Sequence, residues 1–227
     1  MRLQGETGSG ASGEGSTLAA AWLRPETFES LVELNESCLG LLAEQAAARG
    51  AASSLLLRLV TELWDGLDAN ARRRAAACPY LLLDAGFADP LRWRAATAPE
   101  VGDANGTYGS FFTVPATAEV ARLVFTYAWH LARSQSVAAR VLLGMPAPSA
   151  TLIARYTLRQ IQALAERRPE WLKPRWPSRV QVWRELLLAA ASGEAPALER
   201  ARLRGLTLLA AEVRLAAPRA ERCAATP

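Results

Sequence analysis

The chain has 227 residues, of which 51% are hydrophobic, so it is long enough to bury a real core as one large helical domain or as two units of roughly 100 residues. Alanine, leucine and arginine dominate, and β-branched or aromatic runs with a period of two are absent, which excludes a sheet-based fold. The net charge of +4 is a mild excess, more typical of a solvated surface than of a nucleic-acid-binding face. We expect an all-α protein, a multi-helix bundle.

The cysteines and the N-terminus bear on where the protein works. Cys38, Cys78 and Cys223 lie far apart, and none has the spacing of a zinc site. Residues 1–16 are rich in Gly, Ser, Glu and Thr, a composition typical of a flexible lead and not of a signal peptide, and no apolar run reaches about 18 residues. We therefore expect a soluble, cytoplasmic protein with no metal, no cofactor and no membrane partner.

The first half of the chain shows apolar residues at helical spacing. Pro25 suits the first turn of a helix, Asp68 suits an N-cap and Pro79 suits a stop. Helices are predicted over residues 25–50, 53–66 and 68–78, with one more turn starting at Pro90. The short apolar run over residues 79–87 suits a buried strand-like segment or a short helix, and we favour irregular packing against the core. Together these elements predict a first helical unit over residues 17–96.

A junction is predicted over residues 97–116, where Pro, Gly and Asn are frequent and periodicity is lost. The alternative is a functional loop that displays Phe111 and Phe112 to a partner. Helices are then predicted over residues 117–133, 136–143, 149–155, 157–168, 178–192 and 195–215. This pattern predicts a second helical unit over residues 117–215, followed by a flexible tail over residues 216–227.

A shift of the sequence by 90 residues suggests an internal repeat. It aligns identical residues: Pro25 with Pro115, Thr27 with Thr117, Gln45 with Gln135, Pro79 with Pro169, and Trp93 with Trp183. Many aligned alanines and leucines are expected by chance, so the suggestion rests mainly on the proline and tryptophan pairs. The sequence leaves open whether the two helical units are duplicates.

The chain offers little for catalysis. Its single histidine, His130, lies inside a predicted helix beside Trp129 and Leu131, which favours a structural or surface role over that of a general base. The sequence has no GxSxG, no HExxH and no phosphate-cradling Gly-rich loop, and its cysteines lack the His and Asn partners of a nucleophilic thiol. We predict a non-enzymatic protein with no catalytic residue and no small-molecule substrate.

Two tryptophans frame the segment WLKPRW. Trp171 and Trp176 set aromatic faces beside Lys173 and Arg175, a combination suited to docking a partner. The alternative is that the two tryptophans pack at the edge of the helical core and complete it. We assign Trp171 and Trp176 as candidate partner-binding residues and keep the core role open.

Residues 136–168 hold the one pattern that suggests a specific task. A helix-turn-helix unit needs small residues where its helices cross, a turn with glycine, and a second helix with outward side chains. Ala138 and Ala139 suit the first helix, Gly144 suits the turn, and Arg155 suits the exposed side of the second helix. The sequence PAPS lengthens the predicted turn by about two residues over the usual spacing, a departure from a standard groove-reading unit.

The same region resembles a known family. The matching positions are Leu131, Ala132, Ser136, Ala138, Leu143, Gly144, Ala154, Thr157, Leu158, Gln160, Leu164 and Ala165. With them, residues 125–169 resemble FlhD-type flagellar transcriptional regulators, in which a long helix leads into a serine-started helix, a Leu-Gly turn, a short helix and a helix that opens with Thr-Leu-x-Gln. A fainter second copy over residues 31–82 would let one chain imitate the dimer that FlhD forms.

The resemblance implies a helical, bacterial, DNA-associated regulator that acts with a partner subunit. It makes Arg155, Arg159, Arg167 and Arg168 candidates for phosphate contacts, with ordinary surface charge as the alternative for each. Our leading hypothesis is a non-enzymatic, FlhD-like transcriptional regulatory protein that binds a protein partner or itself, with DNA contact left open. The competing hypothesis is a helical adaptor or scaffold that binds no nucleic acid.

Overall fold

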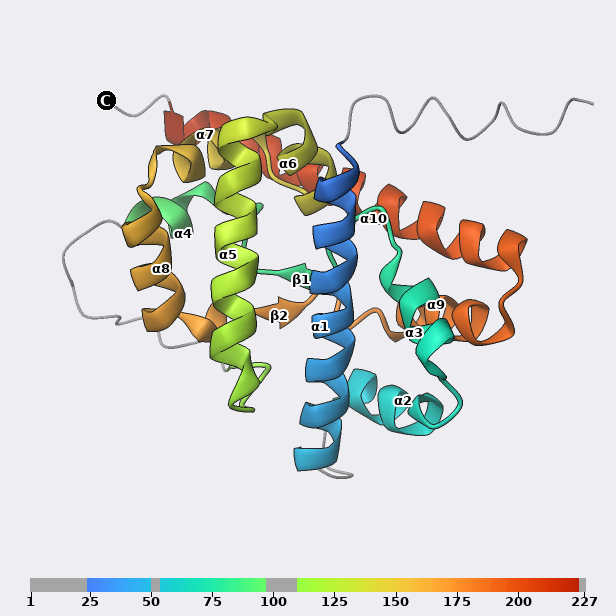
Figure 1. The fold of residues 1–227 in the computed structure, drawn as a ribbon. Helices are drawn as coiled ribbons and strands as arrows, with labels where there is room; N and C mark the ends of the chain where they lie inside the picture. The colour runs from blue at the N-terminus through green and yellow to red at the C-terminus, as the bar shows by residue number, and fades with distance from the viewer. Residues whose placement is uncertain (1–23, 50–53, 97–109, 225–227) are drawn as a thin grey trace, which may run out of the picture.

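A computed structural model of the chain describes residues 24–49, 54–96 and 110–224, and confirms the all-α multi-helix bundle (Figure 1). Its elements are α1 (Pro25–Arg49), α2 (Leu55–Trp64), α3 (Ala69–Ala76), β1 (Leu83–Asp84), α4 (Pro90–Ala95), α5 (Ala116–Ser134), α6 (Ser136–Leu143), α7 (Ala147–Arg155), α8 (Leu158–Arg167), η2 (Pro169–Trp171), β2 (Lys173–Pro174), α9 (Val180–Ser192) and α10 (Ala195–Ala224). Across these ranges no helix combines the length and the apolar character needed to span a bilayer. The predicted flexible lead, most of the predicted junction and the last residues of the predicted tail fall outside these ranges.

Local capping fixes the bounds of several helices. The Asp68 carboxylate accepts a hydrogen bond from the backbone N–H of Ala71 at 2.6 Å, as predicted for an N-cap. Thr157 and Gln160 form a reciprocal capping box at the start of α8. At the other end, α6 stops at Gly144, whose φ of 65° is a left-handed conformation that glycine adopts without steric cost.

Two long antiparallel helices, α1 and α5, form the centre of the bundle (Figure 1). At one end the Tyr127 hydroxyl donates to the carbonyl of Thr27 at 2.8 Å, and the Gln135 amide donates to the Thr27 hydroxyl at 2.9 Å. At the other end the backbone N–H of Thr113 donates to Gln45 at 2.6 Å. Helices α2, α3 and α9 lie on the α1 side, whereas α4, α7 and α8 lie on the α5 side.

A two-residue antiparallel ladder lies between the halves, where we expected irregular packing over residues 79–87. Leu83 pairs with Pro174 and Asp84 pairs with Lys173, and the Lys173 ammonium lies 3.4 Å from the Asp84 carboxylate. Burial acts to raise the pKa of Asp84, but the positive charges of Arg175 and Lys173 outweigh it and hold this pKa below its usual value. Only Leu83 and Asp84 depart from the expected irregular packing, because their pairing partner lies far away in the sequence.

The ladder and its surroundings follow the 90-residue shift. The shift relates Leu83 to Lys173 and Asp84 to Pro174, so it converts each of the two ladder pairs into the other. Two equal units related by a two-fold axis would pair in this way. The same shift relates α4 to α9, and it relates the region of α2 to that of α7. Helix α2 packs against α9 and α4 packs against α7, so in each half the helix that follows the ladder strand packs on the other half. This arrangement is the one that a duplicated unit predicts.

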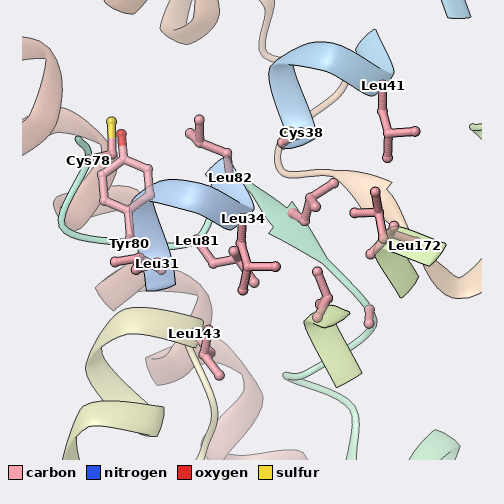
Figure 2. Close-up of a cluster of buried hydrophobic side chains, with 14 of the residues drawn as sticks. Leu31, Leu34, Cys38, Leu41, Cys78, Tyr80, Leu81, Leu82, Leu143 and Leu172 are labelled. Atoms are coloured by element: carbon pink, nitrogen blue, oxygen red, sulfur yellow. The ribbon is translucent and has the colours of Figure 1, made fainter. Parts of the chain in front are cut away.

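The core under α1 contains apolar side chains from both halves. Figure 2 shows Leu31, Leu34 and Cys38 of α1 facing the segment before β1, with Leu143 of α6 and Leu172 beside β2 nearby. The amide of Asn35, which is fully buried, donates to the carbonyls of Ala76 and Tyr80 and accepts from the N–H of Leu82. Because all these bonds are satisfied, Asn35 holds the loop after α3 against α1 without the cost of an unpaired buried amide.

Helix α10 runs from α9 across to the α6–α7 turn and continues past residue 215, where we expected it to end, to Ala224 (Figure 1). Its Glu212 accepts a hydrogen bond from the Trp176 indole at 2.7 Å and lies 3.6 Å from the Arg175 guanidinium. Gly205 of α10 lies directly against the ring of Tyr80, which is 1% exposed. Helix α10 therefore covers residues just before β1 and residues just after β2.

We expect Gly205→Ala to lower the free energy of unfolding by about 2 kcal/mol, since the added methyl group would overlap the buried Tyr80 ring. Gly40→Ala is the matched control, because this glycine also lies within a helix but has open space around the added atom. It should raise the free energy of unfolding by about 0.5 kcal/mol through higher helix propensity. Urea denaturation followed by circular dichroism measures both, and equal effects would contradict tight packing of α10 on Tyr80.

Candidate nucleic-acid interface

Helices α6 and α7 are joined by a three-residue turn, Gly144 to Pro146, because α7 already begins at Ala147. The expectation of a turn lengthened by two residues is therefore wrong. Pro148 lies in the first turn of α7, where its missing N–H has no helical partner to lose. Three residues between the two helices is the spacing typical of a helix-turn-helix.

A groove of about 400 Å³ opens between the end of α5, α6 and α7. Its lining residues are Ala132, Ser136, Arg140, Ala147, Ala150, Thr151, Ala154 and Arg155. The alanines leave room between the helices, while both arginines are exposed at the surface. No acidic side chain is among these residues, and within the described part of the chain neither Arg140 nor Arg155 makes an ion pair. The groove therefore carries uncompensated positive charge.

The other predicted arginines lie on α8 and after it. Arg159 is exposed in the first turn of α8, and Arg167 is exposed in its last turn, where its Nε donates to the carbonyl of Ala163 at 3.2 Å. Arg168 is half-buried and lies 3.6 Å from the carboxylate of Glu170. Arg159 and Arg167 are eight positions apart on α8, about 12 Å along the axis. The structure thus spreads these side chains along α8, whereas Arg155 shares the groove with Arg140.

Both candidate partner-binding residues, Trp171 and Trp176, are buried. This position agrees with the alternative that the two tryptophans are part of the helical core. The ring of Trp171 packs edge-on against Trp93, at 5.6 Å between ring centroids, and also faces Phe125. The ring of Trp176 packs against Tyr80 and donates its N–H to Glu212 of α10. A partner could reach either ring only after the core around it had opened, and partner binding by Trp171 and Trp176 stays a prediction.

The residues with catalytic potential do not form a cluster. His130 is exposed on α5 and lies outside the groove. Cys38 and Cys78 are buried, and burial raises the pKa of both thiols, to about 11 for Cys78, so neither is a thiolate at neutral pH. In the part of the chain that the structure describes, no three His, Cys, Asp or Glu side chains gather where they could hold a metal ion.

Of the two charged residues that line the groove, Arg140 was not predicted as a site residue from the sequence. The exposure of Arg140 could have been predicted from the sequence, because the buried apolar residues of α6 lie on the other side of the helix. These buried residues are Ala138, Ala139, Leu142 and Leu143. The relation of Arg140 to Arg155 depended on where α7 begins, and that start was placed two residues late. Comparison of the chain with protein-family models, with curated proteins and with solved structures finds no match.

Proposed function

We propose that this chain is a non-enzymatic, FlhD-like transcriptional regulatory protein that contacts the DNA backbone through α6, α7 and the start of α8. The observation that supports this proposal best is a pair of exposed arginines, Arg140 and Arg155, in the groove between two helices joined by a three-residue turn. Neither arginine forms an ion pair with another described residue. Guanidinium groups bind phosphate oxygens in a bidentate manner, so such a pair suits a phosphate backbone.

A protein partner or self-association completes this proposal, and α6 offers a surface for it. Val137 and Val141 are one helical turn apart, with 60% and 42% of their surface exposed. Exposed apolar side chains this close to one another are suited to a protein contact. The same pair favours the second candidate function, a helical adaptor that uses α6 for protein binding and touches no nucleic acid.

Arg155→Ala combined with Arg159→Ala should weaken binding to duplex DNA by about tenfold at low salt, because two phosphate contacts are lost. The slope of log affinity against log salt should become shallower by about 2. Fluorescence anisotropy with a labelled duplex, titrated at several salt concentrations, measures both quantities.

The matched control removes the same charge elsewhere. Arg58 on α2 and Arg200 on α10 are exposed arginines without ion pairs in the described structure, and α2 lies on the opposite side of the bundle from α8 (Figure 1). The double variant Arg58→Ala with Arg200→Ala should bind DNA like the unmodified protein. A wild-type chain that binds no DNA at low salt would instead leave the adaptor as the supported function.

A further inference from the structure

The helix that leads into the groove is interrupted in the second half of the bundle, whereas its counterpart in the first half is continuous. In α1 the helix runs through Gln45 without interruption. At the equivalent Gln135 the helix breaks, with φ of −145° and ψ of 65°, and α6 starts in a new direction. The break sets α6 beside α7 and places Arg140 and Arg155 in one groove. By the 90-residue shift the counterpart of Arg155 is Asp65, so the first half has the opposite charge at this position.

We propose that this groove is an anion site that holds a phosphate group between Arg140 and Arg155. The proposal concerns the chemistry of the ligand and stands independently of whether that phosphate belongs to DNA. Two sources share this chemistry: the DNA backbone, which the proposed function supplies, and a free phosphorylated small molecule.

Four features of the groove fit a phosphate. Arg140 and Arg155 provide guanidinium donors, and Ser136 and Thr151 provide hydroxyl donors from the two facing helices. The first turn of α6 begins at Ser136 without a side-chain cap, so its N–H groups and the positive end of the helix add to the favourable field. The volume of about 400 Å³ exceeds one phosphate group and leaves room for the moiety attached to it.

The alternative occupant of such a groove, a carboxylate side chain of the protein itself, is absent from the lining residues. Elsewhere in the bundle exposed arginines do find carboxylates, as in the Arg184 pair with Glu62 and the Arg204 pair with Glu185. The two groove arginines differ from these by facing a concavity with small side chains. A ligand from outside can therefore supply the missing negative charge.

The test follows backbone amide shifts of the isotopically labelled full chain while inorganic phosphate, and separately adenosine monophosphate, is added at constant ionic strength. We expect saturable shifts at Ser136 and Thr151 in the unmodified protein. Arg140→Ala and Arg155→Ala should each weaken this binding by about tenfold or more, because each removes a charged donor. Arg58→Ala, an exposed arginine outside the groove, should leave it unchanged.

A Thr151→Val variant keeps the size of the side chain and removes one hydroxyl, so it should weaken phosphate binding without disturbing the fold. The proposal is overturned if neither probe gives saturable shifts in the groove, or if Arg140→Ala binds phosphate as the unmodified chain does.

A duplex added to the phosphate-loaded protein distinguishes the two sources. Displacement of phosphate by the duplex would support the site and assign it to the DNA backbone. Saturable phosphate binding by a chain that binds no DNA would support the site, assign it to a free phosphorylated compound and refute the proposed function. DNA binding without any phosphate binding in the groove would refute the site and leave the proposed function standing.

Discussion

Replacement of Arg175 by alanine is expected to lower the free energy of unfolding by about 4 kcal/mol, because it leaves several buried carbonyl groups without a donor. The Arg175 side chain is 4% exposed. It donates to the carbonyl oxygens of Leu81 at 2.8 Å, Leu143 at 3.0 Å and Leu83 at 3.3 Å. One side chain thus ties the segment before β1, the ladder and the end of α6 to each other.

Urea denaturation followed by circular dichroism measures this loss, with Arg184→Ala as the control. Arg184 is 45% exposed and its ion pair with Glu62 spans 3.9 Å, so its removal should change the free energy of unfolding by less than about 0.5 kcal/mol. A similar small change for Arg175→Ala would mean that the three carbonyl groups find other donors. Arg175→Lys should be nearly as destabilising as alanine, because an ammonium cannot reach three separate acceptors in a fixed fork.

The second large effect is expected at the tryptophans that the 90-residue shift relates. Trp93→Ala and Trp183→Ala should each lower the free energy of unfolding by about 4 kcal/mol, since both rings are almost fully buried and their loss leaves a large cavity. The Trp93 indole donates to the carbonyl of Gly86 at 3.0 Å, and the Trp183 indole donates to that of Arg175 at 2.8 Å. The Trp93 ring therefore connects α4 to the residues that follow β1, and the Trp183 ring connects α9 to the residues that follow β2.

Thermal and urea unfolding of the two variants measure this effect, and Trp129→Ala provides the control. Trp129 is half-buried on α5 and stacks with the guanidinium of Arg133 at 5.0 Å, a contact worth about 1 kcal/mol. Losses at Trp93 and Trp183 that differ by several kcal/mol would show that the two sites are not energetically equivalent, despite their shared place in the repeat.

Helix positions could be predicted from the sequence because the residues that start and end a helix act locally. The N-cap at Asp68 acts within a few residues, so the sequence alone places it correctly, whereas α3 ends at Ala76, two residues before the end that Pro79 predicts. The start of α7 was misplaced because Pro148 looks like a turn residue, although proline is equally suited to a first helical turn. That error of two residues concealed the standard spacing of the α6–α7 turn.

The remaining features depend on contacts between distant segments. The ladder joins Leu83 to Pro174, and nothing within either short segment specifies its partner. Arg175 lies in an apparently exposed, basic segment, but its acceptors come from three other parts of the chain, so its burial could not be predicted from local pattern. The groove likewise required the relative placement of α6 and α7, although the exposed position of Arg155 on α7 was expected from the sequence.

The packing of α4 and α9 on opposite halves has a consequence for how this chain can change by mutation. In a dimer of identical subunits every substitution appears twice, so a charge placed near the symmetry axis meets its own copy. A single chain that contains both halves is free of this constraint. Its first half has a buried Ala85 where its second half has Arg175, a difference that a symmetric pair of identical subunits could not hold. Linkage in one polypeptide thus lets one half specialise while the other preserves the fold.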